Sequence, residues 1–147
     1  MPAIHFNECG NFRDDSQIVV KENRREFRIV NNNHKKLLEV KVDGCLINIE
    51  GKRCDWLLIE IDNNHAHFIE LKGCEIKEAF KQLENTIRII SDPNNGYIEN
   101  EFMKKWAYVV CSRSPMNSTE IQNQKINFKK KLKAVLVVHE TKYTVNM

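Results

Sequence analysis

One stretch near the middle of the chain decides the fold. It reads Cys54-Asp55-Trp56-Leu57-Leu58-Ile59-Glu60-Ile61, then Asp62-Asn63-Asn64-His65, then Ala66-His67-Phe68-Ile69-Glu70-Leu71-Lys72-Gly73. Two apolar runs rich in strand-forming residues are separated by a short segment whose Asp and Asn side chains favour turns. The stretch therefore predicts a β-hairpin with a four-residue loop over 62–65.

Charged side chains interrupt the apolar pattern of this hairpin. Because side chains alternate between the two faces of a strand, Glu70 and Lys72 share one face. A loop over 62–65 places Asp55 opposite Lys72, on the same face as Glu70. Opposed Cβ atoms lie about 4.5–5.5 Å apart and diagonal ones roughly 7–8 Å, so Asp55 and Glu70 could hold one hard cation between their carboxylates, with the Lys72 ammonium beside it. The alternative is an exposed ion-pair ladder on a solvated sheet face, and spacing alone leaves both interpretations open.

The sequence on either side of the hairpin predicts further strands. Residues 37–49 alternate in part and are rich in β-branched side chains, with a bulge or tight turn at Asp43-Gly44. Residues 15–30 fit neither a helical nor an alternating period, so they form a strand or a short helix. Strands are also predicted over 106–111, 134–138 and 143–145.

Two helices are predicted between the later strands. Over 75–90 the apolar residues recur at spacings of three and four, which is typical of an amphipathic helix. Asn117-Ser118-Thr119-Glu120 has the pattern of a capping box and predicts that a second helix begins there. The elements together predict one α/β domain over residues 1–147, with a central mixed sheet, made of the antiparallel hairpin plus further strands, flanked by helices.

Composition narrows the functional classes. The chain has 23 Lys and Arg against 20 Asp and Glu, a net charge of +3, so any affinity for nucleic acid must come from a local patch. No apolar run approaches the roughly 18–20 residues of a membrane span, and the N-terminal residues lack the pattern of a secretory signal. Five cysteines without a C-x-x-C pair predict free thiols in a reducing compartment. We therefore expect a cytoplasmic protein with no membrane partner.

The two histidines of the hairpin are the remaining metal-ligand candidates in this stretch. With the loop over 62–65, His65 falls in the turn and His67 on the strand face opposite Glu70. We interpret them as a turn residue and a packed residue.

The pattern of acids and lysine resembles the PD-(D/E)XK nuclease superfamily. Members carry an Asp on one strand of a hairpin and Glu-x-Lys on the next, a dozen or so residues later, with a helix following. Asp55 and Glu70-Leu71-Lys72 match this motif, and the surrounding residues are similar to those of small uncharacterised bacterial members. The proline that names the family is absent, since Cys54 precedes Asp55. The resemblance spans roughly residues 37–112 and implies a restriction-endonuclease-like core.

The resemblance also implies an activity. Members of this kind are Mg²⁺-dependent endonucleases or exonucleases that hydrolyse phosphodiester bonds, and we expect DNA as the substrate. Asp55, Glu70 and the backbone carbonyl of Leu71 would hold the Mg²⁺, for which Mn²⁺ would substitute. Lys72 would orient water or stabilise the charge of the transition state. Gln82 lies where several subfamilies place an active-site glutamine.

Related nucleases often supply a further acid from an upstream helix. Glu22 and Glu26 lie at a suitable distance before Asp55, and Glu39 and Asp43 are rivals. We rank Glu22 first and Asp43 second.

A basic segment in the second helix offers a surface for nucleic acid. Lys125, Lys129 and Lys133 are spaced four apart and would share one helical face that could track phosphates. The alternative is a solvated outer face, and the same choice applies to the cluster Arg24, Arg25 and Arg28. A symmetric dimer or a partner protein would let a nuclease of this size reach both strands of a duplex.

A different class of function fits the same scaffold. The chain could be a catalytically silent module that binds nucleic acid or another protein. The intact set of Asp55, Glu70 and Lys72 argues against silence, because a binding module has no need to hold these charges on a partly buried face.

Overall fold

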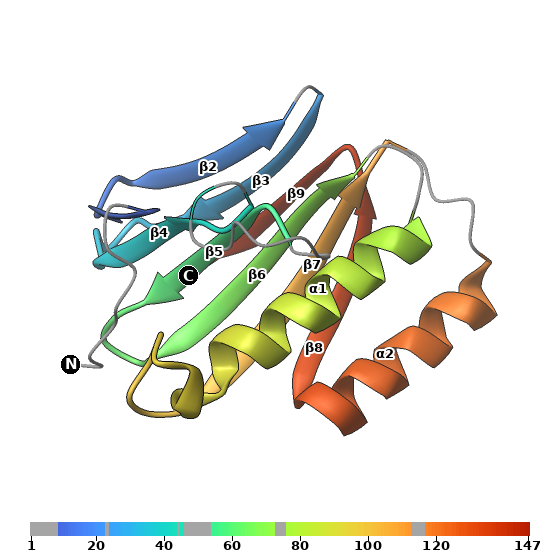
Figure 1. Ribbon diagram of the computed structural model, residues 1–147. Helices are drawn as coiled ribbons and strands as arrows, with labels where there is room; N and C mark the ends of the chain where they lie inside the picture. The colour runs from blue at the N-terminus through green and yellow to red at the C-terminus, as the bar shows by residue number, and fades with distance from the viewer. Residues whose placement is uncertain (1–8, 23, 44, 46–53, 73–75, 113–116) are drawn as a thin grey trace.

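The computed structural model describes residues 9–22, 24–43, 45, 54–72, 76–112 and 117–147, and it places one large sheet at the centre of the molecule (Figure 1). The strand order is β1-β4-β5-β6-β7-β8. The strands are β1 (Gly10–Arg13), β4 (Leu37–Lys41), β5 (Trp56–Glu60), β6 (His65–Lys72), β7 (Lys104–Cys111) and β8 (Ala134–Glu140). Neighbours from β1 to β6 are antiparallel, and β6, β7 and β8 are parallel. The predicted mixed sheet is confirmed.

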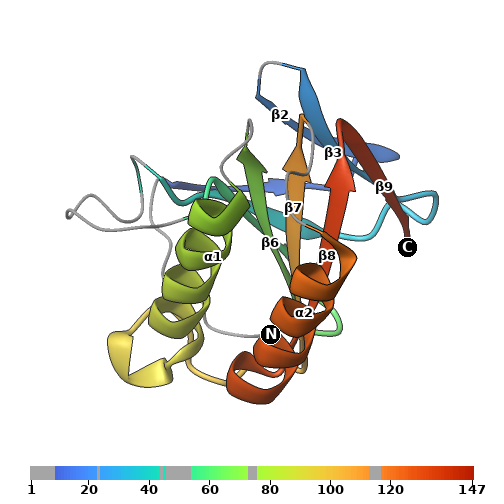
Figure 2. The same ribbon diagram turned by 90° about the vertical axis from the view of Figure 1, so that its right-hand side faces the viewer.

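Two helices cover one face of this sheet (Figure 2). Helix α1 (Ile76–Ser91) connects β6 to β7, and α2 (Ser118–Leu132) connects β7 to β8, as parallel neighbours require. The predicted start of α2 is confirmed with Asn117 as the N-cap, because the Asn117 side chain accepts a hydrogen bond from the backbone N–H of Glu120 at 2.9 Å. A 3₁₀ turn, η2 (Pro93–Asn95), follows α1.

A second sheet covers the opposite face, so the predicted helices flank the large sheet on one face only (Figure 2). Its strand order is β2-β3-β9, with β2 (Gln17–Glu22), β3 (Arg25–Val30) and β9 (Lys142–Asn146). Residues 15–30, which the sequence left as strand or helix, therefore form a β-hairpin. Ile18 and Ile29 are opposed in register and both fully buried, so alternate side chains of this hairpin do pack inward.

The large sheet is buried on both faces. On the helix side, Leu57 and Phe68 pack against the apolar face of α1. On the other side, Phe27 from the small sheet lies with its ring centroid 4.5 Å from that of Tyr108 in β7. The chain passes from the large sheet to the small one at Thr141, whose φ of 62° lies in the left-handed region. Both helices and the small sheet are thus anchored to the same central strands.

The hairpin register differs by two residues from the prediction. The turn occupies 61–64, and the pairs are Glu60 with His65 and Trp56 with Ile69. Asn64 closes the turn with a φ of 57°, a conformation that Asn tolerates better than most residues. A shift of two leaves every side chain on its predicted face, but it brings Asp55 opposite Glu70 instead of Lys72.

The cysteines are only partly as expected. Cys9 and Cys45 form a disulfide, which corrects the prediction of free thiols for this pair. Cys54 and Cys111 are free and buried, as predicted. Cys74 lies outside the described residues. Neither of the two described α-helices has the length and apolar character needed to cross a membrane.

Truncation of Phe27 tests the packing between the two sheets. We expect Phe27→Ala to lower the free energy of unfolding by about 3–5 kcal/mol, because it leaves a cavity between the sheets. Phe12→Ala is the control: its side chain is 53% exposed, and the cost should stay below about 1 kcal/mol. Urea denaturation measures both values, and equal costs would contradict the buried interface.

Candidate functional site

Asp55 lies directly before β5, at the point where β5 stops pairing with β6. Its Oδ2 accepts a hydrogen bond of 2.9 Å from the backbone N–H of Leu71. The N–H and C=O of one strand residue point to the same side, so the Leu71 carbonyl faces the same edge as Asp55. The Asp55 side chain therefore takes the place of the missing strand partner at the end of β6.

Glu70 is the most deeply buried acid of the predicted set. It lies in β6 opposite Val109 of β7, and its side chain is 1% exposed. Cys54 is close by: burial raises the pKa of its thiol, and the charge of Glu70 raises it further. A carboxylate buried to this degree is costly unless its charge is compensated. Glu70 is thus a buried acid near the carboxyl end of β6.

Glu22 is brought to Asp55 by the small sheet. It ends β2, and it lines the same cavity as Asp55, close enough for the two carboxyl groups to interact electrostatically. Burial and the charge of Asp55 raise the pKa of Glu22, although Arg25 and Lys41 act in the opposite direction. Two carboxyl groups in contact repel each other when both are ionised, so this pair favours a shared proton or a cation.

A cavity of about 240 Å³ adjoins this pair. It is lined by Lys21, Glu22, Lys41, Asp43, Asp55 and Trp56. Both acids ranked for the upstream position therefore reach the cavity of Asp55, although Glu22 comes from a strand and not from a helix. The other two rivals have different partners: Glu26 pairs with Arg28 at 3.1 Å, and Glu39 pairs with Arg13 at 2.9 Å.

Helix α1 contributes polar groups behind the acids. Thr86 accepts a hydrogen bond from the backbone N–H of Cys54 at 2.7 Å and donates one to the carbonyl of Gln82 at 2.8 Å. The Oε1 atom of Gln82 is buried and has no hydrogen-bond partner among the described residues. Thr86 was not predicted from the sequence. Its one signal there is that a polar residue stands among the apolar residues that α1 buries.

Lys72 lies in a strand, whereas the lysines predicted to contact nucleic acid lie in α2 or at its end. Lys72 lies in β6 opposite Cys111, and its side chain is outside the described part of the chain. Lys125 is half-buried and Lys129 exposed, but Lys133 lies beyond the end of α2, with a φ of 53°. The expectation that the three share one helical face is therefore wrong for Lys133, because the left-handed cap turns the chain out of the helix.

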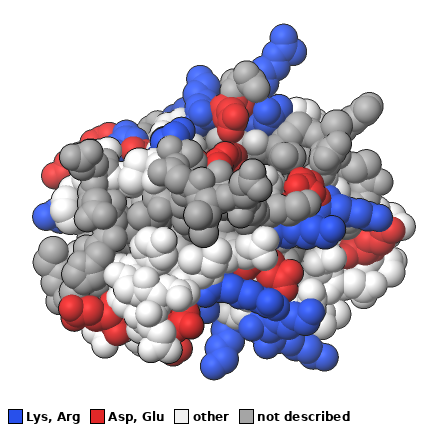
Figure 3. All heavy atoms as spheres, viewed as in Figure 1, with Lys and Arg blue, Asp and Glu red and all other residues white. Residues whose placement is uncertain are grey.

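Basic residues at the turn between β2 and β3 lie nearer to the acids. Lys21 lines the cavity of Asp55, and Arg24 is exposed in the turn. Arg25 donates a hydrogen bond of 3.0 Å to Ser112, which follows β7. Figure 3 shows basic atoms with acidic atoms among them at the top of the molecule, where this turn lies in Figure 1. The rim of the site thus combines both signs of charge.

The histidines of the hairpin belong to a separate buried network. His67 lies 2.6 Å from Glu60 through Nε2 and 2.8 Å from the Tyr108 hydroxyl through Nδ1. Burial alone would raise the pKa of Glu60, but the contacts with His67 and Asn63 lower it. His67 is a packed residue as predicted, whereas His65 begins β6 instead of lying in the turn.

The donor set suits a hard cation. Carboxylate oxygens and a backbone carbonyl are the ligands that Mg²⁺ prefers. Among the described residues, no three His, Cys, Asp or Glu side chains converge as a ready metal-binding group. What converges is the pair Glu22 and Asp55, with Glu70 opposite Asp55 by extension of the hairpin register.

Comparison of the chain with family models, with curated proteins and with solved structures found no match.

Removal of the Glu22 charge should stabilise the metal-free protein at neutral pH. Because the pKa of Glu22 is raised in the folded protein, the protonated carboxyl group stabilises the folded state. This stabilisation is lost as the pH rises through the pKa that Glu22 has in the folded state. We expect Glu22→Gln to raise the free energy of unfolding at pH 7 by a few tenths of a kcal/mol, as for a partly exposed charge pair. The gain should vanish below the ordinary glutamate pKa of about 4.3.

Urea denaturation at pH 7 and pH 4 in the presence of a chelator measures this difference. Glu99→Gln is the control, because Glu99 is exposed and distant in sequence from the site. Equal effects of the two substitutions at pH 7 would contradict the contact between Glu22 and Asp55.

Thr86 should be needed to hold the segment before Asp55. Thr86→Val keeps the shape of the side chain but leaves the buried N–H of Cys54 without its acceptor, at a cost of about 1–3 kcal/mol. Thr119→Val, on the exposed first turn of α2, should change stability by less than about 0.5 kcal/mol. Thermal unfolding checks both, and a neutral Thr86→Val would show that this hydrogen bond is dispensable.

Proposed function

We propose that the protein is a metal-dependent nuclease that hydrolyses phosphodiester bonds of DNA. The observation that carries the proposal is that Glu22 and Asp55 line one cavity, where Asp55 is bonded to the end of the strand that holds Glu70. Glu22 and Asp55 lie where their negative charges repel each other, with Glu70 on the neighbouring strand, and a divalent cation would relieve that repulsion.

The location of Glu70 and Lys72 in the sheet supports the same proposal. Glu70 and Lys72 lie near the carboxyl end of β6, beside the carboxyl end of the parallel strand β7. In open α/β sheets, ligands bind outside the carboxyl ends of the strands. Lys21 and Arg24 on the rim supply positive charge that can contact the phosphates of a nucleic acid.

Each residue has a distinct task in the proposed mechanism. Asp55, Glu70 and the Leu71 carbonyl would hold Mg²⁺, with Glu22 as a further acid. When bound, Mg²⁺ supplies a Lewis acid that polarises the scissile phosphate and lowers the pKa of water. Lys72 orients the attacking water or stabilises the added charge of the transition state. The buried Oε1 atom of Gln82 would accept a hydrogen bond from a water or a side-chain donor of the site.

The activity test is Mg²⁺-dependent cleavage of labelled DNA by the whole chain. Asp55→Asn and Lys72→Met should each lower the cleavage rate by about 100-fold or more, the size expected for loss of one charge-stabilising group. Asp62→Asn, in the exposed hairpin turn, is the matched control and should retain full activity.

Two outcomes would contradict the proposal. One is full cleavage by the Asp55→Asn and Lys72→Met proteins. The other is DNA binding without cleavage in either Mg²⁺ or Mn²⁺, which would support the silent binding module instead.

A further inference from the structure

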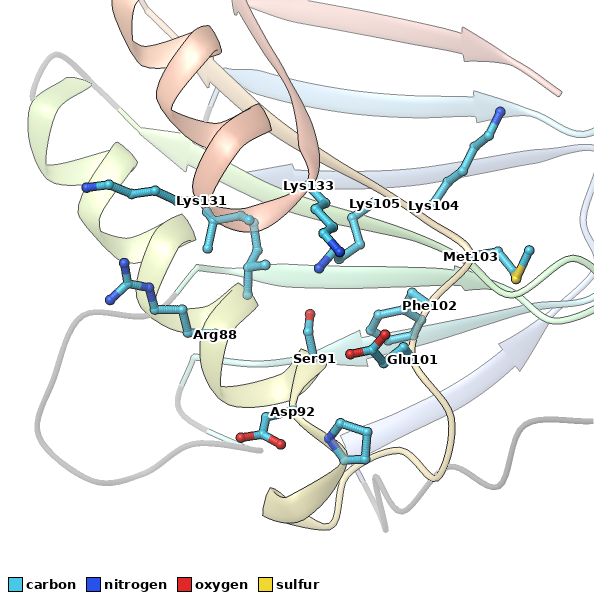
Figure 4. Close-up of a pocket in the computed structure, with 13 residues that line it drawn as sticks. Arg88, Ser91, Asp92, Glu101, Phe102, Met103, Lys104, Lys105, Lys131 and Lys133 are labelled. Atoms are coloured by element: carbon cyan, nitrogen blue, oxygen red, sulfur yellow. The ribbon is translucent and has the colours of Figure 1, made fainter.

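A second cavity opens at the end of the molecule opposite the acids. Its volume is about 360 Å³, and it lies between the ends of α1 and α2 and the start of β7 (Figure 4). Five of its lining residues are basic, namely Arg88, Lys104, Lys105, Lys131 and Lys133, and two are acidic. Lys105 and Cys111 lie six residues apart along β7, so roughly 20 Å of strand separates this cavity from the carboxyl end of the sheet.

Two ammonium groups are held close together in this cavity. Lys105 is half-buried: burial and the charge of Lys133 lower its pKa, although Glu101 raises it. Figure 4 shows the side-chain ends of Lys105 and Lys133 side by side. Like charges in a partly desolvated place are unfavourable without a counter-charge. Glu101 acts on the pKa of Lys105 more strongly than Lys133 does, so its carboxylate offsets part of the repulsion between the two ammonium groups.

The backbone of Lys133 is unusual for this residue type. It caps α2 with φ 53° and ψ 39°, and its N–H bonds to the carbonyl of Phe128. Glycine is the common residue in this conformation, because residues with a Cβ atom adopt it only at an energetic cost. Such costs are retained where a side chain is needed in one place. The side chain of Lys133 lines the cavity.

The Ser91 hydroxyl is a third hydrogen-bond donor beside the ammonium groups of Lys105 and Lys133. Ser91 ends α1, and its hydroxyl is buried without a hydrogen-bond partner among the described residues. In Figure 4 this hydroxyl points toward the ammonium groups of Lys105 and Lys133. A buried hydroxyl without a partner is uncommon and indicates an absent ligand or water.

Asp92, Arg88 and Lys131 have partners or point elsewhere, whereas the Glu101 carboxylate faces the cavity in Figure 4. Asp92 accepts a hydrogen bond from the Asn94 N–H at 3.0 Å. Arg88 pairs with Glu84 at 2.9 Å, and in Figure 4 Arg88 and Lys131 point away from the centre. The groups that converge are thus the two ammonium ions and the hydroxyl, with Glu101 on the opposite wall.

We propose that this cavity binds a phosphate group between Lys105 and Lys133, with the Ser91 hydroxyl as a third donor. A tetrahedral oxyanion accepts hydrogen bonds from several directions, and charge-assisted bonds of this kind are strong. Met103 is 74% exposed beside the cavity and offers an apolar contact to the remainder of a phosphorylated molecule. The phosphate comes either from a free mononucleotide or from the backbone of a nucleic acid strand.

The test uses inorganic phosphate with the whole chain, measured by thermal unfolding and by calorimetric titration at constant ionic strength. Phosphate should stabilise the protein more than chloride does, because it binds only the folded state. Lys105→Met and Lys133→Gly should each weaken phosphate binding by about tenfold or more, the loss expected for one charged hydrogen bond.

The variants separate binding from folding. Lys133→Gly suits the left-handed backbone and should not lower the stability of the protein. Lys131→Met is the matched control: its side chain lines the same cavity but points away, and phosphate affinity should stay within about twofold of the parent value. Asp55→Asn should bind phosphate normally, so this test is independent of the proposed nuclease activity.

The source of the phosphate follows from two further titrations. Tighter binding of adenosine monophosphate than of phosphate identifies a free nucleotide, and a loss of single-stranded DNA affinity in Lys105→Met identifies a strand. The proposal is overturned if phosphate stabilises no more than chloride, or if Lys105→Met and Lys133→Gly bind phosphate as well as the parent protein.

Discussion

Strand β6 is the constraint on which the rest of the structure depends. It pairs antiparallel with β5 on one side and parallel with β7 on the other. Helices cover one of its faces and the small sheet covers the other, so Phe68 and Ile69 are both fully buried on opposite sides. A charged residue in such a strand must find compensation. Glu70 therefore lies where β5 has ended and other groups can approach.

The small sheet matters to the site as well as to the core. It packs on the large sheet through Phe27, and the same hairpin carries Glu22 to Asp55. The hydrogen bond from the Leu71 N–H fixes Asp55 beside the end of β6. Packing between the two sheets thus sets the distance between the acids, which joins the stability of the fold to the proposed chemistry.

Much of this could be predicted from the sequence, and the failures have physical causes. The hairpin, both helices and the parallel strands follow from periodicity and capping, which are local properties. The segment 15–30 was ambiguous because it belongs to the small sheet. The third strand of that sheet comes from residues 142–146, far along the chain. The register was wrong by two residues because Asn64 closes the turn one position before the predicted loop ends.

The candidate site was predictable in its residue types but not in its assembly. Faces follow from a period of two, so the sequence predicts Asp55 and Glu70 on one face, whereas the approach of Glu22 depends on the packing of two sheets. The most direct test of the proposed metal site is anomalous diffraction from crystals soaked in Mn²⁺. The account predicts a Mn²⁺ ion about 2.0–2.3 Å from oxygen atoms of Asp55 and Glu70, near the Leu71 carbonyl. Mn²⁺ bound only at other residues, with Asp55 and Glu70 free of metal, would contradict it.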